Sequence, residues 1–246
     1  QVAPPFAGDL RQRIGFAGTD TAGDALVIGV VRDLNRRLVE PRPEEAVYIP
    51  VGQAPPDSLG QMNLVLRTTA NRASVAAAAL DAGAVLVNDI SAMRFDAQMA
   101  PLIARRGASV ALMHMQGTPR TMQQAPSYRH VLDEVYRFLD ERLDCALQYG
   151  IPRQRIVLDP GFGFGKTVQH NLDLLHGLGH LRALGQPLLV GTSRKSFLGH
   201  VLRRQVWDRL EGTLATVLYA VLHGAVLVRV HDVAAVTQTV RLLEAL

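Results

Sequence analysis

The stretch RIVLDPGFGFGKT, residues 155–167, joins a short apolar run to a carboxylate and a glycine-rich turn. The run from Ile156 to Leu158 shows no alternation of apolar and polar residues, which is typical of a strand buried on both faces of a parallel sheet. Asp159 stands where that strand ends. Taken alone, Asp159 before Pro160 fits a turn cap as well as a functional group. The stretch therefore predicts a buried strand that carries a polar residue at its carboxyl end.

The glycine-rich turn looks like a phosphate-binding loop, but its spacing excludes both nucleotide patterns. A P-loop has Gly, four residues and then Gly-Lys-Ser/Thr. Residues 165–167 end that pattern, but Pro160 takes the place of its first glycine and has no N–H to donate. The dinucleotide pattern Gly-x-Gly-x-x-Gly, counted from Gly161, would need a glycine at Lys166. The turn is thus predicted to build an end-of-strand site and not to cradle phosphate.

Apolar runs of this kind recur along the chain, and most are separated by segments with helical periodicity. Eight such strands in 246 residues predict a (β/α)8 TIM barrel, with a doubly wound open sheet as the alternative. We expect a single domain over residues 1–246. The runs are ALVIGVV (25–31), AVYIPVG (46–52), NLVLRT (63–68), AVLVND (84–89), ASVALMHM (108–115), RIVLDPG (155–161), PLLVGTS (187–193) and AVLVRVH (225–231).

Composition narrows the class of protein. Apolar residues make up 48% of the chain, which is ample for a core, and the net charge is only +4 with no block of basic residues, so we expect no nucleic-acid partner. Cys145 is the single cysteine, which excludes a disulfide within one chain and predicts a reducing, cytoplasmic setting. No apolar run reaches ~18 residues and the start lacks the pattern of a signal peptide, so no membrane association is expected.

Polar residues gather at the ends of the last five runs. In a barrel the carboxyl ends of the strands meet at one mouth, where active sites are built. Each residue also has a simpler reading as a loop charge, a packed histidine or a helix cap, and Asp232 is expected to cap the last helix. Their recurrence over five successive strands favours a shared site. The residues concerned are Asn88, His114, Asp159, Lys195, Ser196, Arg229 and His231.

From about Ser74 to the C terminus, the chain resembles the dihydropteroate synthase family. The segments LVNDIS, LMHMQGTPRTMQ, DPGFGFGKT, GTSRKSFLG and VRVHDV occur in the family's order and spacing. The resemblance implies a TIM barrel that dimerises through its last helices. It also implies a reaction that joins 6-hydroxymethyl-7,8-dihydropterin pyrophosphate to 4-aminobenzoate, giving 7,8-dihydropteroate and pyrophosphate in folate biosynthesis. Sulfonamides, as aminobenzoate mimics, are expected inhibitors.

The resemblance also implies roles for individual residues. A carboxylate and a carboxamide can read the donor and acceptor edge of a pterin. Cations suit the departing pyrophosphate, and a guanidinium can stack on the ring. Mg²⁺ is implied as a cofactor, but no protein ligand for it is identifiable. The expected contacts are Asp159, Asn88 and Lys195 with the pterin, Arg229 and His231 with pyrophosphate, Phe164 and Ser196 with 4-aminobenzoate, and Gly163 in the turn that approaches the ring.

Residues 1–70 depart from the family pattern. Arg32 stands in place of an asparagine, Pro50 in place of an aspartate, and Thr69 in place of an aspartate that contacts the pterin. Only residues 53–62 separate the second and third runs, too few for a parallel crossover, so the first two to three βα units are expected to be irregular or incomplete. A divergent paralogue, an altered sequence and a misplaced alignment all remain open.

Two functions follow from this contrast. The intact later segments favour a dihydropteroate synthase, whereas Arg32, Pro50 and Thr69 favour a pterin-binding paralogue with little or no turnover. A pterin-dependent methyltransferase is a weaker third reading, since SRKSFLG and MHMQGTP are similar to the synthase.

Overall fold

The computed structural model describes residues 26–30, 46–48, 63–65, 72–81 and 84–246. Each of the eight predicted apolar runs contains a strand. The strands are shorter than the runs. Their bounds are β1 Leu26–Val30, β2 Ala46–Tyr48, β3 Asn63–Val65, β4 Leu86–Asp89, β5 Ser109–Met113, β6 Ile156–Asp159, β7 Leu188–Val190 and β8 Ala225–Val230.

The strands form one sheet in the order β1-β8-β7-β6-β5-β4-β2-β3. Within the run β4 to β8 all pairs are parallel, and β1 is parallel to β8. Each residue of β4, β5, β6 and β7 is buried, as expected for strands covered on both faces. The prediction of an α/β protein with a parallel sheet is therefore confirmed.

Strand β2 departs from a regular barrel. It is antiparallel to β3 and also to β4, whereas in a regular barrel β2 would be parallel to β3 and would not pair with β4. The short segment 53–62 accounts for the first pair, because an antiparallel pair needs no crossover helix. Among the described residues β1 and β3 stand at the two ends of the strand order. The irregularity thus falls in the units where the sequence predicted it.

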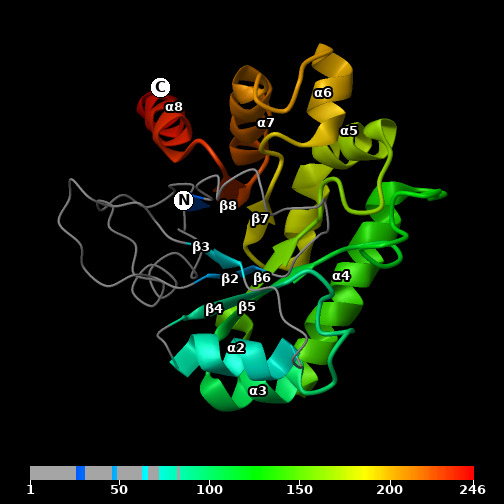
Figure 1. Cartoon of the computed structure of the whole chain (residues 1–246), viewed down its shortest axis with the longest axis vertical. Coiled ribbons are helices and arrows are strands. Elements are labelled where there is room, and N and C mark those ends of the chain that lie inside the picture. The colour runs from blue at the N-terminus through cyan, green and yellow to red at the C-terminus, as the bar shows by residue number, and fades with distance from the viewer. Residues whose placement is uncertain (1–25, 31–45, 49–62, 66–71, 82–83) are drawn as a thin grey trace.

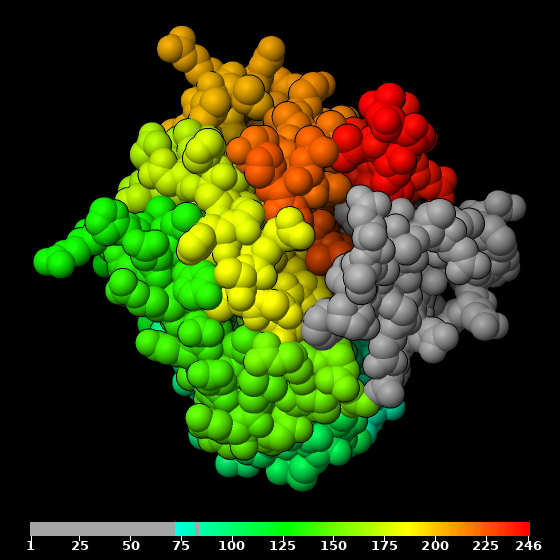
Figure 2. All heavy atoms as spheres, turned by 180° about the vertical axis from the view of Figure 1, so that it is seen from behind, coloured from blue at the N-terminus to red at the C-terminus, as the bar shows by residue number. Residues whose placement is uncertain are grey.

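The helices lie along an arc around the strands, from α2 and α3 through α4 and α5 to α7 and α8 (Figure 1). The same progression along the chain is visible from behind (Figure 2). In the described part of the chain, no helix combines the length and apolar character that a membrane crossing requires. The helices are α2 Arg72–Asp81, α3 Met99–Arg106, α4 Val131–Gln148, α5 Val168–His176, α6 Ser196–Leu202, α7 Leu210–Leu222 and α8 Val233–Ala245, with 3-10 turns at Arg153–Arg155 and Leu178–Leu184.

Helix α4 shows how the sequence pattern fixes the core. Val131, Val135, Leu139 and Leu143 recur every four residues and are buried against the sheet. The helix ends before Gly150, which adopts a φ of 82° that few other residues tolerate. Both features depend on local sequence pattern: an apolar residue at every fourth position and a glycine just past the end of the helix. The core they build holds the strands' polar carboxyl ends at one edge of the sheet.

Candidate active site at the strand ends

Arg229 of β8 connects the ends of two other strands. Its Nη1 donates a hydrogen bond to Oδ1 of Asn88 at 2.9 Å and lies 3.0 Å from Oδ2 of Asp159. Asn88 is 3% exposed and Asp159 is fully buried, so the carboxylate is desolvated and depends on the guanidinium for charge compensation. The backbone of Gly191, after β7, passes so close that a Cβ there would lie 2.7 Å from Nη2 of Arg229.

The contact between Arg229 and Asn88 shows that the sheet is curled. Strands β8 and β4 are four places apart in the strand order, which in a flat sheet would separate them by roughly 19 Å. The two side chains nevertheless form a hydrogen bond of 2.9 Å. The sheet therefore bends back toward itself and encloses the carboxyl ends of β4, β6 and β8 around one place. Convergence of these residues was the central geometric expectation from the sequence.

Asn88 and Asp89, which are adjacent on β4, have different hydrogen-bond partners. Asp89 is bonded within its own loop: Oδ1 accepts from the backbone N–H and hydroxyl of Ser91, and Oδ2 accepts from the N–H of Met93. Asp89 thus holds the loop after β4, in which Ala92 and Met93 have positive φ values of 50° and 64°. Asn88 points to Arg229 instead. The adjacent pair therefore divides into a structural carboxylate and a site carboxamide.

The glycine-rich turn directs its amides inward, toward the protein. The N–H of Gly161 donates to Oδ1 of Asp159, that of Gly163 donates to Oδ1 of Asn171, and that of Phe164 donates to the carbonyl of Gly161. A phosphate cradle needs such N–H groups to be available to the ligand. The prediction that this turn is not a phosphate cradle agrees with this bonding.

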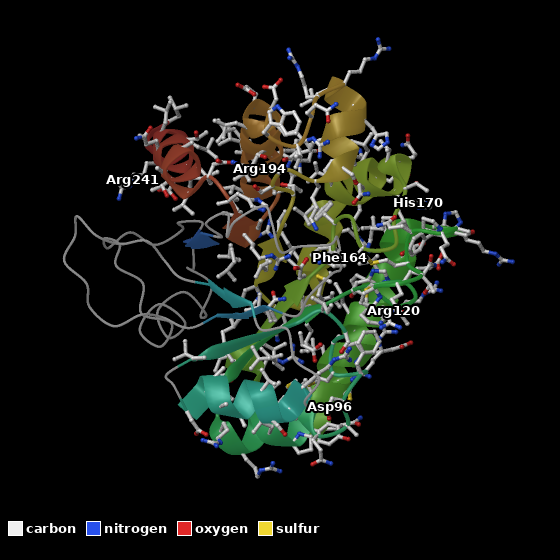
Figure 3. All side chains as sticks on the ribbon, viewed as in Figure 1. Asp96, Arg120, Phe164, His170, Arg194 and Arg241 are labelled. Atoms are coloured by element: carbon white, nitrogen blue, oxygen red, sulfur yellow. The ribbon has the colours of Figure 1, made fainter. Side chains whose placement is uncertain are left out.

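Phe164 lies near the middle of the molecule, whereas Asp96 and Arg241 lie at its margin (Figure 3). The Nζ of Lys195 is 4.2 Å from the centroid of the Phe164 ring, which is a cation–π distance. A Cβ on Gly163 would lie 3.1 Å from Cδ of Lys195, so the turn packs closely along the lysine. The turn after β6 and the loop after β7 therefore meet at Lys195.

Electrostatics set Lys195 apart from an ordinary surface lysine. Burial and the nearby Arg229 lower the pKa of Lys195 to about 8, and Asp159 partly opposes this shift. Each of these groups belongs to the same cluster of strand ends. Lys195 can therefore exchange its charge near neutral pH, which is typical of functional lysines.

The loops after β7 and β8 are tied together by two contacts. Oγ of Ser193 lies 2.9 Å from Nδ1 of His231 and accepts the backbone N–H of that residue at 3.1 Å. Arg194 donates to both carboxylate oxygens of Asp232, at 3.0 and 2.6 Å. The expectation that Asp232 caps the last helix is right about its position but wrong about its side chain. Asp232 occupies the N-cap position of α8, but its side chain makes no cap hydrogen bond, because the guanidinium of Arg194 binds both oxygens.

His231 and Ser196 stand at the outer side of the site. Partial burial, followed by the charge of Arg194, lowers the pKa of His231, and Asp232 opposes that shift. The imidazole is therefore largely neutral at pH 7 unless an anion binds beside it. Ser196 is exposed at the first residue of α6, directly after Lys195. The structure thus places both residues beside the cluster but outside its buried centre.

His114, at the end of β5, is a packed histidine as the simpler reading held. Its ring makes an edge contact with Phe138, with centroids 4.8 Å apart. Burial and then the charge of Lys166 lower the pKa of His114 well below its usual value. Lys166 itself is 4% exposed and was given no role by the sequence reasoning, which tested it only as part of a P-loop.

The described residues offer no protein cage for a metal: none of them forms a cluster of three or more His, Cys, Asp or Glu side chains suited to one. The magnesium ion implied by the resemblance therefore has no identified ligand among these residues. Arg32, Pro50 and Thr69, where the sequence departs from the family pattern, lie outside the described residues.

A family model described as "Pterin binding enzyme" matches residues 37–231. The chain belongs to the pterin-binding enzyme family. The match takes in each of the strand ends that form the site. It also begins well inside residues 1–70, so part of the divergent sector is still similar to the family.

Among relatives of this pterin-binding enzyme, a dihydropteroate synthase from Mycobacterium leprae is 38% identical over 238 residues, covering 94% of this chain and 80% of the relative. A dihydropteroate synthase from Synechocystis is 42% identical over 187 residues, covering 76% of this chain and 65% of the relative. The crystal structure of dihydropteroate synthase from Xanthomonas albilineans in complex with 7,8-dihydropteroate has a TM-score of 0.66 at 40% identity, covering 72% of this chain and 64% of that one. The chain thus spans slightly under two thirds of the last two relatives.

Proposed function

We propose that the chain is a dihydropteroate synthase, a transferase that condenses 6-hydroxymethyl-7,8-dihydropterin pyrophosphate with 4-aminobenzoate to give 7,8-dihydropteroate and pyrophosphate. The observation that carries this proposal is the buried cluster of Asn88, Asp159 and Arg229, with Lys195 and Phe164 beside it. Family membership and the relatives named dihydropteroate synthase support it. The solved relative bound to 7,8-dihydropteroate binds the product that the proposed reaction forms.

The buried carboxylate suits the polar edge of a pterin. Oδ1 of Asp159 is occupied by the N–H of Gly161, but Oδ2 accepts no hydrogen bond from the described residues. Oδ2 is therefore the acceptor for a ring N–H, and Asn88 adds an amide that both donates and accepts. A site built from such groups rejects a ring without matching donors, because the protein groups would stay buried and unpaired. Lys195 supplies a further donor to the same edge.

The reaction breaks the C–O bond between the pterin methylene and pyrophosphate, and the electron pair leaves with pyrophosphate. The amine of 4-aminobenzoate then forms the new C–N bond and loses one proton to solvent or to the departing anion. Arg229 and His231 face the charge that develops on the leaving group. Because the carbon is activated by the ring and by departure, the enzyme has to position the amine more than deprotonate it.

The second substrate belongs beside Phe164. The ring of Phe164 is half-buried and packs against Ile90, Met113 and Met115, and this packing holds the ring in place. Nζ of Lys195 lies 4.2 Å from the centroid of the same ring. We place the aromatic ring of 4-aminobenzoate against Phe164 and its carboxylate at Ser196. The Mg²⁺ of the proposal would accompany the pyrophosphate oxygens, since magnesium usually retains waters and substrate phosphates as ligands.

The finer architecture belongs to the same proposal. A single TIM-barrel domain with irregular first units is supported by the curled sheet and by the parallel pairing of β4–β8 and of β1 with β8. A homodimer through the last helices is what the family resemblance implies; Leu222 on α7, 67% exposed, and Leu242 on α8, 64% exposed, would be available to a partner. The proposed cytoplasmic location rests only on the single cysteine of the sequence, which is typical of proteins in a reducing compartment.

A coupled assay for dihydropteroate, with both substrates and Mg²⁺, tests the proposal. The expected result is product formation that is lost in Arg229→Met. The alternative, a pterin-binding paralogue without turnover, rests on Arg32, Pro50 and Thr69. It predicts measurable pterin binding, weakened in Asp159→Asn, with no product at any enzyme concentration.

A further inference from the structure

The chain contains two lysines, Lys166 and Lys195, among its 26 lysine and arginine residues. Both lie at the candidate site: Lys195 contacts Phe164, and Lys166 is buried beneath the turn that carries Phe164. Arginine serves every other basic position of the sequence. A lysine differs from an arginine in having a compact ammonium with three rotatable donors on a flexible stem. The use of lysine at these two positions, in a chain otherwise rich in arginine, suggests that the compact ammonium suits the site.

Lys166 uses all three donors. Its Nζ lies 2.9 Å from the carbonyl oxygen of Gly161, 3.2 Å from that of Phe164 and 2.9 Å from Nδ1 of His114. An ammonium group has three N–H bonds and no acceptor, so these partners match it one to one when Nδ1 of His114 carries no proton. The lowered pKa of His114 keeps its ring neutral and able to accept. A guanidinium carries at most two N–H bonds on any one nitrogen, so it could not place three donors at the position of Nζ.

These hydrogen bonds tie the turn to itself and to β5. The carbonyls of Gly161 and Phe164 belong to the turn after β6, and His114 directly follows β5. Gly161 already lies against β5, since a Cβ there would be 1.9 Å from the carbonyl oxygen of His114. Because Lys166 holds the carbonyl of Phe164 directly, it fixes the residue whose ring lies 4.2 Å from Nζ of Lys195.

We propose that Lys166 is a positioning residue of the synthase site: its three hydrogen bonds hold the turn so that Phe164 walls the aminobenzoate pocket and keeps Lys195 aimed at the pterin. The proposal rests on the proposed synthase function. Lys166 touches neither substrate in this arrangement and acts through Phe164.

The surroundings of Lys166 connect it to the charge state of the site. Burial lowers the pKa of Lys166 to about 7, Asp159 opposes the shift and Lys195 adds to it. The titratable groups around it are His114 from β5, Asp159 from β6 and Lys195 from the loop after β7. Loss of its proton removes one donor from the three-bond set, so the turn should loosen as pH rises above 7.

Lys166→Met and Tyr128→Phe form a matched pair for the test. Each removes a side-chain hydrogen bond to the same turn, since the hydroxyl of Tyr128 donates to the carbonyl of Gly165 at 2.7 Å. Only Lys166 bonds the carbonyl of Phe164. We expect Lys166→Met to raise the KM for 4-aminobenzoate by about tenfold or more, with a smaller rise for the pterin substrate, the scale of a misplaced contact. Tyr128→Phe should lower the melting temperature but should not raise the KM for 4-aminobenzoate more than the KM for the pterin substrate.

Equal KM values for 4-aminobenzoate in the two variants would overturn the proposal. If the parent protein forms no dihydropteroate, the proposed synthase function is wrong, but the role of Lys166 can still be tested. The two variants are then compared by their Kd for 4-aminobenzoate, and Lys166→Met should again be the weaker binder. A measurement on the parent protein covers the case in which Lys166→Met does not fold. With ¹³C-labelled lysine the chain gives two side-chain NMR signals, assigned through Lys195→Met. The Lys166 signal should shift when 4-aminobenzoate saturates the site, and an unmoved signal would refute the tether.

Discussion

The guanidinium of Arg229 and the carboxylate of Asp159 form an ion pair at the ends of β8 and β6, with Nη1 3.0 Å from Oδ2. This Oδ2 is buried and accepts no hydrogen bond from the described residues, because the pair is close but not aligned for one. A buried oxygen without a hydrogen bond carries a desolvation penalty that a ligand N–H can relieve. The pair therefore marks where the pterin edge is expected to dock.

Asp159→Asn should weaken pterin binding by about 1–3 kcal/mol, the cost of leaving a buried donor or acceptor without its partner. Asparagine keeps the shape of aspartate and can still accept from Gly161, but its NH2 group would face Arg229 and the ring N–H. Isothermal titration of a 6-hydroxymethylpterin measures the change. Asp173→Asn is the control, because Asp173 is an exposed carboxylate on α5 that bonds only Gln169 among the described residues. Equal affinity in the two variants would remove Asp159 from the pterin site.

The pH dependence of activity should report Lys195. Because its pKa is lowered to about 8, its ammonium form is lost as pH rises through 8, and kcat/KM should fall along that limb. Lys195→Arg keeps a cation that does not titrate in this range. Its activity is expected to be low and to lose the limb near pH 8, keeping only the fall that deprotonation of Lys166 causes above pH 7. A falling limb near pH 8 that persists in Lys195→Arg would assign the limb to another group.

Stability should depend on pH for the same reason. In the unfolded chain Lys195 titrates near its ordinary value of 10.5, whereas in the folded protein it titrates near 8. Between these values the unfolded state binds more protons, so the free energy of unfolding rises with pH. Lys195→Met lacks this contribution. The free energy of unfolding, measured in urea from pH 7 to 10, should therefore increase more with pH in the parent than in Lys195→Met. Parallel pH curves would show that Lys195 is not desolvated.

Sulfonamides should compete with 4-aminobenzoate for the space between Phe164 and Ser196. The apparent KM for 4-aminobenzoate should rise with sulfonamide concentration while kcat stays constant. Phe164→Ala should weaken both ligands together, because both would lose the same aromatic wall. Steady-state kinetics at several sulfonamide concentrations measure this. Inhibition that is not relieved by excess 4-aminobenzoate would contradict a shared pocket.

The sequence predicted the parts of the fold that depend on local pattern. Uninterrupted apolar runs found all eight strands, and the polar residues after them identified Asn88, Asp159 and Arg229, which the structure brings into contact. The antiparallel pairing of β2 with β4 was not foreseen, because strand direction depends on partners far apart in the chain. The short segment 53–62 signalled only that a parallel crossover was missing.

Side-chain partners were the harder part of the site. Asp232 has the sequence position of a helix cap, but Arg194, 38 residues earlier, takes both of its oxygens. Lys166 looked like the remnant of a failed P-loop, and its bond to His114 crosses 52 residues. Neither contact leaves a local signal. The scarcity of lysine was the one feature of the sequence that could have drawn attention to Lys166.

Alanine substitutions at Gly161 and Gly185 can separate the cost of a steric clash in the glycine-rich turn from the cost of backbone strain. Both have positive φ values, 70° and 68°, so alanine at either position pays roughly 1–2 kcal/mol for a left-handed conformation. At Gly185 a Cβ would meet no atom within 4 Å, whereas at Gly161 it would lie 1.9 Å from the carbonyl oxygen of His114. Gly161→Ala should therefore lower the melting temperature more than Gly185→Ala and should also reduce activity, because the turn must move away from β5 and carry Phe164 with it. Thermal unfolding followed by circular dichroism measures the first effect, and the dihydropteroate assay measures the second. Equal losses of stability in the two variants would show that the turn is free to shift, which is incompatible with a rigid wall for the aminobenzoate pocket.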